Sequence, residues 1–487
     1  MRQKPVLYVL ILGSFISVYN TCSMNVGLPA FIDIFDSDLA TVQWLMTGFT
    51  LATGVIIPLS GYLGDRFSHK QVFLYSIAGL MASSALCAVS WSIYSLIAFR
   101  ILQGVFCGII QPVTLTIIFQ AIPKQQRNVA LSFWSASSIL GPALAPTISG
   151  WLLGHNWHWM FLVLVPVSIL TLWMGVKWIP RDPPSASGPL DRLGLMYAVC
   201  GSLALLLYFG NIHQWGLWSY RSAFVLILGL ASSLLFVRHE LRVKAPLLHL
   251  RLFRSRIFMS SILVSAILII GLYSGIYFVP LYLQEIHRMS PFEVGLLLLL
   301  PSLSSGAATL LAGALYPRIG AFRLVIAGAV LIVLASWQFS FLALDTNLAY
   351  VAFWMAVRYI GIGLSMTPAM NAGMHAAAAE WYSHASALIN WLRQIFGALA
   401  LGLFTSLFYA RQNLHITVLQ QSAATPSAEW IRLSAYTLGI DDSFVVAALL
   451  VLLSLPLALL LRERRRDKEG RESREEPTLT TPAQTRV

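Results

Sequence analysis

Long apolar stretches separated by short polar loops repeat along the whole chain of 487 residues. About 20 apolar residues are enough to cross a bilayer as a helix. The pattern predicts fourteen such spans, near residues 5–29, 43–63, 71–92, 95–120, 128–153, 158–179, 193–211, 221–238, 258–282, 293–315, 323–344, 348–371, 384–409 and 443–461. Because fourteen is even, both ends of the chain should lie on one side of the membrane.

The positions of the basic residues test this arrangement, because short cytoplasmic loops are rich in Lys and Arg. Most of the 32 Lys and Arg residues fall on the side of the N-terminus, which begins MRQK. On the opposite side only Arg221, Arg288, Arg411 and Arg432 are expected. Both termini are therefore predicted to be cytoplasmic, in a multi-pass protein of the plasma (inner) membrane.

Composition agrees with a membrane protein, since 57% of the residues are hydrophobic and 11% are charged, with a mean hydropathy of +0.73. The net charge of +12 fits contact with anionic membrane lipids and gives no support for nucleic-acid binding. The four cysteines all fall in apolar stretches, which argues against disulfides and against a metal site. No cofactor, metal or catalytic residue is expected.

Two segments are predicted to lie outside the membrane. The stretch from Arg411 to Asp442 reads as an exterior loop that could carry a short amphipathic helix. The tail 462–487 is charged, has few large apolar residues, and is expected to be disordered. The predicted domains are residues 1–180 as an N-terminal six-helix bundle, 181–257 as two inserted helices and a linker, and 258–461 as a C-terminal six-helix bundle.

A polar loop, GYLGDRFSHK from Gly61 to Lys70, separates two of the predicted spans. Gly61 and Gly64 leave room for two helices to approach closely, and Asp65 lies where the free N–H groups of the next helix attract an anion. The loop is either a solvated hairpin or a functional latch.

A degenerate copy of this loop in the second half of the chain favours a latch. Arg318 follows Gly313 at the spacing found in the first loop, and Pro317 occupies the position of the aspartate. The two halves are thus expected to be related. The loop resembles the signature of the major facilitator superfamily, in which an aspartate and basic residues latch the cytoplasmic side. That resemblance assigns the latch to Gly61, Asp65, Arg66 and Lys70.

A second candidate motif opens the fourth span, where Arg100, Gln103 and Gly104 occur in FRILQGVFCG. An arginine inside the bilayer costs about 2.5–3.5 kcal/mol on insertion scales, so Arg100 should face protein or water, unless it reaches the headgroups. The spacing resembles a superfamily signature in which the arginine bonds to the first helix and serves proton coupling. Arg358, with Gly361 and Gly363, repeats it weakly.

A third motif lies in the fifth span, SSILGPALAPTISG. Two prolines four residues apart should bend this helix, and the small residues form a face for close packing. Gly141, Pro142, Pro146 and Gly150 resemble the antiporter motif of the superfamily, although Ala145 and Ser149 stand where glycines are usual.

Several longer segments narrow the resemblance to one branch, the fourteen-helix drug:proton antiporters typified by EmrB and QacA. These segments are DRLGLMY at Asp191, PLLHLRLFRSRIF at Pro246, PLYLQEIHRMSPFEVGLLLLLP at Pro280 and SALINWLRQIFGALALG at Ser386. The branch implies an all-α major-facilitator fold of two six-helix bundles plus two extra helices, and export of amphipathic small molecules by proton antiport. In a Gram-negative cell a periplasmic adaptor protein would be a further partner.

One feature of the branch is missing. Asn20 stands where the branch usually has an aspartate, and Cys22 where it has a threonine. None of the 20 acidic residues falls in the core of a predicted span. Proton coupling therefore rests on the resemblance alone.

The superfamily lines its central cavity with spans 1, 4, 5, 9, 10, 12 and 13, and pockets combine aromatic residues with a few polar anchors. For each aromatic candidate, ordinary helix packing is the competing interpretation. The candidates are Tyr19, Asn20, Gln111, Trp134, Tyr273, Tyr277, Asn371, Asn390 and Arg393.

Other classes of protein fit the sequence less well. An enzyme would need a reactive constellation within the membrane, and a sensor would need an output domain larger than the 26 residues of the tail. No phosphate-binding loop for ATP occurs. Within transport, the alternative is a dedicated exporter of one metabolite, lipid or siderophore.

Overall fold

The computed structural model describes residues 3–181, 189–216, 219–422 and 427–462. All regular elements in these ranges are helices. The main ones are α1 (Gln3–Phe35), α3 (Trp44–Phe67), α4 (His69–Ala88), α5 (Ile93–Ala121), α6 (Lys124–Leu153), α8 (Leu164–Trp178), α9 (Arg192–Trp215), α10 (Tyr220–Glu240), α11 (Arg256–Glu285), α12 (Pro291–Gln338), α13 (Leu348–Ala376), α14 (Tyr382–Ser422) and α15 (Ala428–Leu452). Short helices are α2 (Leu39–Val42), α7 (Trp159–Leu162), α16 (Ser454–Ala458) and the 3₁₀ turns Leu250–Arg254, Phe339–Phe341, Ala379–Trp381 and Leu459–Leu461.

The helices accommodate the predicted spans. Twelve helical stretches of the described chain are long and apolar enough to cross a membrane. One of them, Phe292–Phe341, holds two helices, because Gly320 has non-helical dihedral angles (φ 76°, ψ 168°) inside α12. The 30-residue α6 is a further helix of spanning length. This all-helical arrangement agrees with the fourteen-span major-facilitator fold predicted from the sequence.

Polar residues fix where several helices begin. Ser92 and Ser290 form capping boxes with Ser95 and Glu293 at the starts of α5 and α12. Asp191 accepts a hydrogen bond from the Gly194 amide and so caps α9. These caps satisfy the free N–H groups that each helix start would otherwise leave exposed to lipid or buried.

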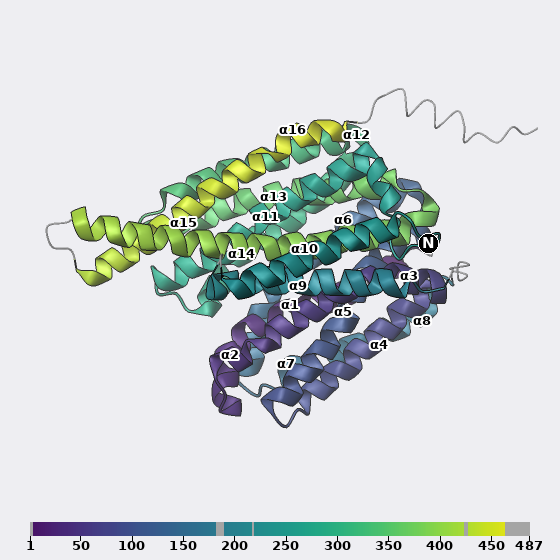
Figure 1. Ribbon diagram of the computed structural model, residues 1–487, viewed down its shortest axis with the longest axis horizontal. Coiled ribbons are helices and arrows are strands. Elements are labelled where there is room, and N and C mark those ends of the chain that lie inside the picture. Colours follow the sequence, from purple (N-terminus) through teal and green to yellow (C-terminus); the bar gives the residue numbers. More distant parts are fainter. Residues whose placement is uncertain (1–2, 182–188, 217–218, 423–426, 463–487) are drawn as a thin grey trace, which may run out of the picture.

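The helices pack in two groups (Figure 1). In the first, the N-half (α1–α8), α1 packs on α6 and α8, and α5 packs on α3 and α4. In the second, the C-half (α11–α16), α11 packs on α13, α14 and α15. The two halves meet where α3 contacts α14 and where α6 contacts α12.

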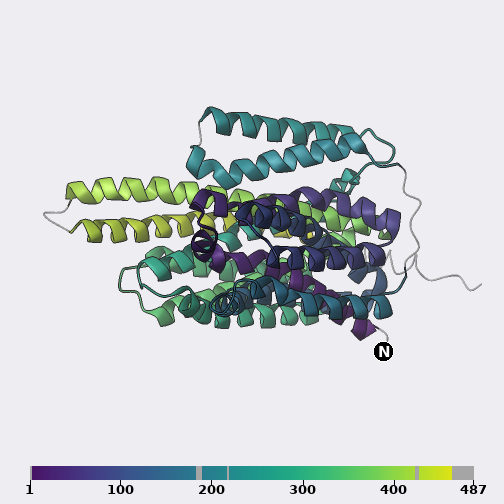
Figure 2. The ribbon, with the colours of Figure 1, turned by 90° about the horizontal axis from the view of Figure 1, so that it is seen from below.

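The inserted helices α9 and α10 lie on one side of this assembly (Figure 2). The α9 helix packs on α3 of the N-half and on α14 of the C-half, whereas α10 packs mainly on α9. Trp391 of α14 donates a hydrogen bond to Ser202 of α9 at 2.7 Å. The inserted pair thus covers the seam between the halves.

We call the end of the bundle that holds the α3–α4 connection the inner face, and the opposite end the outer face. The α14 and α15 helices extend beyond the bundle at the outer face, as Figures 1 and 2 show. The predicted loop from Arg411 to Asp442 is therefore wrong for most of its length. Helix α14 continues to Ser422 and α15 begins at Ala428.

Charged side chains join the two helices of this extension. Asp442 of α15 accepts hydrogen bonds from Arg411 at 2.6 Å and binds His415 of α14 at 2.7 Å. Hydropathy identifies segments that lie within the membrane and does not detect a polar helix outside it. The polar composition of this segment therefore gave no indication of the two helices.

Candidate functional site

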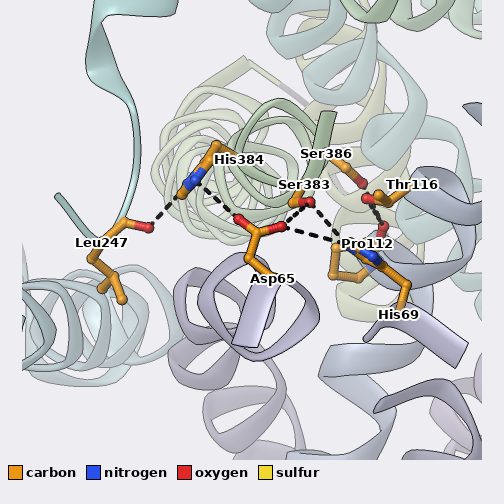
Figure 3. Close-up of polar contacts among 8 residues, drawn as sticks. All are labelled: Asp65, His69, Pro112, Thr116, Leu247, Ser383, His384 and Ser386. Atoms are coloured by element: carbon orange, nitrogen blue, oxygen red, sulfur yellow. Dashed lines mark hydrogen bonds and ion pairs between the residues drawn. The ribbon is translucent and has the colours of Figure 1, made fainter. Parts of the chain in front are cut away.

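Asp65, at the inner end of α3, is the centre of a polar cluster between the two halves (Figure 3). Its Oδ1 accepts a hydrogen bond from the Ser383 hydroxyl of α14 at 2.7 Å, and its Oδ2 lies 3.3 Å from His384 Nε2. His69 Nε2 of α4 lies 2.8 Å from the same Ser383 hydroxyl. Because that hydroxyl donates to Asp65, His69 must donate to it. We call Asp65, His69, Ser383 and His384 the inner gate.

The linker between α10 and α11 closes the inner gate from one side. His384 Nδ1 lies 3.2 Å from the Leu247 carbonyl oxygen, and the His249 ring meets the His384 ring edge-to-face at 4.4 Å. The other face of His249 stacks on Trp381 at 5.2 Å. Burial, reinforced by His384, lowers the pKa of His249 to about 4. His249 is thus a neutral aromatic cover at neutral pH.

Proton positions in the gate follow from its acceptors. A carbonyl oxygen only accepts, so His384 Nδ1 carries a proton toward Leu247. Nε2 of the same ring lies 3.3 Å from Asp65 Oδ2, so the ring is held between the linker and Asp65.

Other bonds between the halves lie toward the same face. Asn371 of α13 donates to Asn128 of α6 at 2.5 Å, and Arg127 donates to the Tyr382 hydroxyl at 3.2 Å. Deeper in the bundle, Ser386 donates to the Pro112 carbonyl oxygen at 2.6 Å. Toward the outer face, α2 and α7 of the N-half diverge from α14 and α15 in Figure 1. This structure therefore has its inner face closed.

The remaining predicted latch residues have different roles. Gly61 lies against the Ser383 carbonyl of α14, since a Cβ there would be 3.5 Å from that oxygen. Lys70 donates to the carbonyl oxygens of Val176 and Ile179, so it caps the C-terminus of α8 within the N-half. Arg66 is exposed. Of the four, Asp65 and Gly61 contact the C-half.

The degenerate copy of the loop occupies the equivalent place in the other half. A Cβ on Gly313 of α12 would lie 1.9 Å from the Ser132 hydroxyl of α6. The two loop glycines thus mark two of the contacts between the halves, α3 with α14 and α12 with α6.

Arg100 is fully buried and bonds within the N-half. Its Nη1 donates to Asn20 Oδ1 of α1 and to Gln103 Oε1, both at 2.6 Å, and its Nε donates to the Leu45 carbonyl at 3.3 Å. Phe49 lies under the guanidinium, with 4.2 Å from Cζ to the ring centre. Gly104 lets α3 approach, because a Cβ there would lie 2.5 Å from the Phe49 oxygen. The arginine thus joins α1, α3 and α5.

Arg358 of α13 repeats this arrangement in the C-half. It is fully buried, donates to Ser336 and Ser274 at 2.6 Å each, and also donates to the Gly271 carbonyl. Phe444 lies under its guanidinium at 5.3 Å. Both guanidinium groups therefore make their hydrogen bonds to polar atoms of their own half.

The third motif lies on α6, which the structure describes as one helix from 124 to 153. Gly141 packs on α1, since a Cβ there would lie 2.5 Å from Val18 Cγ1. Gly150 lies near the outer end of the helix. The side chains of Pro142 and Pro146 lie outside the described part of the chain.

Most predicted cavity residues of the N-half are bonded within that half. Tyr19 bonds with Ser149 at 3.0 Å. Trp134 and Gln111 both donate to Ser14, one to its hydroxyl at 2.6 Å and the other to its carbonyl at 3.4 Å. Tyr19 and Trp134 are 2% exposed, which places them in the packed interior here.

The predicted cavity residues of the C-half divide into two sets. Asn371 belongs to the closed inner side, and Asn390 donates to the Ser386 carbonyl of its own helix. Arg393 lines a cavity of only about 10 Å³ with Ser265 and Phe396. The Arg393 Nη1 group contacts the Met370 sulfur at 3.9 Å.

Tyr273 and Tyr277 are both partly buried on α11, and Tyr273 lies over Gly397, one turn from Arg393. Among the predicted candidates, Arg393 and Tyr273 thus lie close together, and Arg393 lines the small cavity.

Sequence reasoning did not identify His69, Ser383 and His384 as gate residues, or Asn128 as a contact between the halves. The segment that resembles the drug antiporters begins at Ser386. Ser383 and His384 lie just before it and belong to no motif that the sequence analysis recognised.

Comparison with known proteins identifies the class. The model of the Major Facilitator Superfamily matches residues 10–401. The chain therefore belongs to the Major Facilitator Superfamily, a family of membrane transporters and not of enzymes.

Two relatives define its position within the family. The chain is 27% identical to the lincomycin resistance protein LmrB of Bacillus subtilis, over 95% of this chain and 96% of the relative. It is 30% identical to a multidrug resistance protein B homolog of Mycobacterium tuberculosis, over 86% of this chain and 79% of the relative. The predicted resemblance to the fourteen-helix drug antiporters is thus confirmed.

The fold matches a solved structure as well. The human organic anion transporter MFSD10 (TETRAN) superposes with a TM-score of 0.63 over 94% of this chain and 99% of that chain, at 14% identity. At that identity the match supports the fold alone.

Proposed function

We propose that this secondary transporter exports amphipathic small molecules by alternating access, with protons as the counter-ion. The printed names of its relatives, lincomycin resistance and multidrug resistance proteins, support export of drug-like compounds. The observation that carries the mechanism is the inner gate, a bonded contact between halves that must break for the inner face to open. The gate is the two-state element that alternating access requires.

The proposal includes an orientation and a division of the chain. The inner face is cytoplasmic, both termini lie on that side, and the membrane is the plasma (inner) membrane. Residues 1–180 and 258–461 form the two moving bundles, and 181–257 join them. The distribution of Lys and Arg along the loops supports this orientation.

A substrate panel tests export directly. We expect a sensitive host that expresses the protein to tolerate several chemically unrelated amphipathic compounds and to accumulate less of each. Resistance to a single compound would favour the alternative, a dedicated exporter of one metabolite, lipid or siderophore.

Proton coupling is tested with Asn20. A protonophore should abolish efflux, and Asn20→Asp should retain it. The Asn20 Nδ2 group has no partner among the described residues, while Oδ1 already accepts from Arg100. An aspartate there removes the unpaired donor and gains an ion pair. Efflux that continues with the protonophore would contradict proton antiport.

Substrate charge is tested with Arg393. Because Arg100 and Arg358 are solvated by hydroxyl and carbonyl oxygens, Arg393 is the arginine placed to act on a substrate. A cation beside it would be repelled in a medium of low dielectric constant. We expect better efflux of a neutral or weakly acidic lipophilic drug than of a quaternary ammonium dye.

Arg393→Gln should reduce efflux of the acidic drug by about tenfold and narrow its advantage over the dye, a change of about 1.4 kcal/mol in transport selectivity. Arg288→Gln, on the exposed outer face, is the matched control. Strong export of the dye with little export of the other compounds would contradict a cavity of positive potential.

A further inference from the structure

Two buried carboxylates meet at the inner ends of the inserted helices α9 and α10. Asp191 precedes α9, and Glu240 is the last residue of α10. The Asp191 side chain is 7% exposed and Glu240 is 4% exposed. Neither belongs to the twelve-helix core, and neither is part of the inner gate.

Each carboxylate has one oxygen that is bonded and one that is not. Asp191 Oδ1 accepts from the Gly194 amide and binds His239 Nε2, both at 2.9 Å. Glu240 Oε2 accepts from the Leu248 amide at 3.1 Å. Among the described residues, Asp191 Oδ2 and Glu240 Oε1 are buried without a partner.

The two unpartnered oxygens face each other across Gly194. A Cβ on Gly194 would lie 2.4 Å from Asp191 Oδ2 and 2.6 Å from Glu240 Oε1. The two oxygens are thus no more than about 5 Å apart. Two carboxylates so close and so buried cannot both ionise at low cost, so the pair favours holding one proton. We infer that Asp191 and Glu240 form a site that binds a single shared proton and that this proton controls the inner gate.

A continuous set of bonds joins this site to the gate. The Leu248 amide donates to Glu240, and the carbonyl of the same peptide group, that of Leu247, accepts from His384. His384 in turn pairs with Asp65. One peptide group of the linker therefore connects the shared proton to the ion pair between the halves.

Loss of the proton should act through this peptide group. Two ionised carboxylates repel each other, so Glu240 moves away from Asp191. Through its hydrogen bond to the Leu248 amide it pulls the Leu247–Leu248 peptide group with it. His384 then loses the Leu247 acceptor that orients its ring toward Asp65. Proton release to the inner side should accordingly favour opening of the inner face, and proton binding should favour the closed state seen here.

Titratable and charged groups surround the site on several elements, among them Tyr197 of α9, whose ring meets that of His239, and Arg251 of the linker, which adds to burial in lowering the pKa of His249. On α10, His239 faces the bonded oxygen of Asp191. Beyond the linker peptide lie His384 of α14 and Asp65 of α3, and His249 covers His384. A pH response of the gate could arise at the carboxylate pair or at one of these histidines, so the test must separate them.

The test uses the full-length protein in lipid nanodiscs without substrate. Its readings do not depend on drug export, so it can fail while the proposed function stands. Infrared difference spectra across a pH titration report protonated carboxyl groups. Spin labels at Gln125 of α6 and Arg318 of α12, both exposed at the inner face, report opening, with the four native cysteines replaced by alanine.

In the wild type we expect a protonated carboxyl band and an inner face that opens as pH rises. Glu240→Gln mimics the protonated state, so it should remove the band and hold the label distance short at every pH. Asp191→Asn leaves Glu240 as the single carboxyl group of the site, so its band should disappear at a lower pH than in the wild type, because repulsion from Asp191 is removed.

Two controls make the outcome decisive. Glu380→Gln alters an exposed glutamate at the inner face and should change neither reading. His239→Gln should keep both the band and the pH response. The inference is overturned if the wild type shows no protonated carboxyl band, since a bridging water or cation would then satisfy the two oxygens. It is also overturned if Glu240→Gln still opens with pH or if His239→Gln abolishes the response.

Discussion

Asp65→Asn should lower efflux by about one to two orders of magnitude while the protein still inserts normally in the membrane. Asp65 accepts from Ser383 and pairs with His384 across the two halves. A hydrogen bond to a charged group contributes about 1.5–3 kcal/mol, and about 1.4 kcal/mol changes an equilibrium tenfold. Asparagine keeps the shape but loses the charge, so the closed inner face is destabilised relative to the open one. Efflux is measured at matched surface expression.

Asp345→Asn is the matched control, because Asp345 is exposed at the outer face. His384→Gln should weaken efflux in the same direction, and the double variant should be no worse than the stronger single variant, because both remove one contact. Normal efflux by Asp65→Asn at normal surface expression would show that this cluster is only a solvated hairpin.

The membrane spans could be predicted because a single chain segment in lipid satisfies its backbone hydrogen bonds only as a helix. Every backbone N–H and C=O in the bilayer must bond within its own helix, so a long apolar stretch fixes both the element and its length. The outer hairpin escaped prediction because that constraint ends at the membrane surface. Beyond it, Asp442 with Arg411 and His415 stabilises helices that hydropathy does not register.

Of the inner gate, only the Asp65 side could be predicted from the sequence. Asp65 stood out through its loop and the copy at Gly313, both local patterns. Its partners Ser383 and His384 lie more than three hundred positions away in the chain, and no local pattern ties them to Asp65. The same limit applies to Glu240, which lies beside Asp191 only because the hairpin of α9 and α10 brings their ends together.

The arginines could be located but not interpreted from sequence. Polar cost predicted that Arg100 would face protein or water, and both Arg100 and its weak repeat Arg358 are fully buried. Whether they point to a cavity or to helix carbonyls depends on how close neighbouring helices approach. Gly104 and Gly275 permit this close approach. The Phe49 carbonyl oxygen occupies the space that a Cβ on Gly104 would take, and the Arg358 guanidinium occupies the space that a Cβ on Gly275 would take.

Arg100→Met should be the most destabilising single change in the N-half, and Asn20→Asp should make it worse. The substitution removes the donors of Asn20 Oδ1, Gln103 Oε1 and the Leu45 carbonyl. Each buried group left unpaired costs about 1–3 kcal/mol. We expect a large fall in the thermal midpoint of the purified protein and loss of efflux.

Asn20→Asp alone should leave the thermal midpoint near that of the wild type, because its carboxylate pairs with Arg100. Combined with Arg100→Met, the same aspartate becomes a buried charge with no counter-charge, which costs about 3–5 kcal/mol. Thermal unfolding of the four proteins of this cycle therefore measures how far Arg100 depends on Asn20. Purely additive changes would mean that the two side chains act separately, and that Arg100 serves α3 and α5 without the first helix.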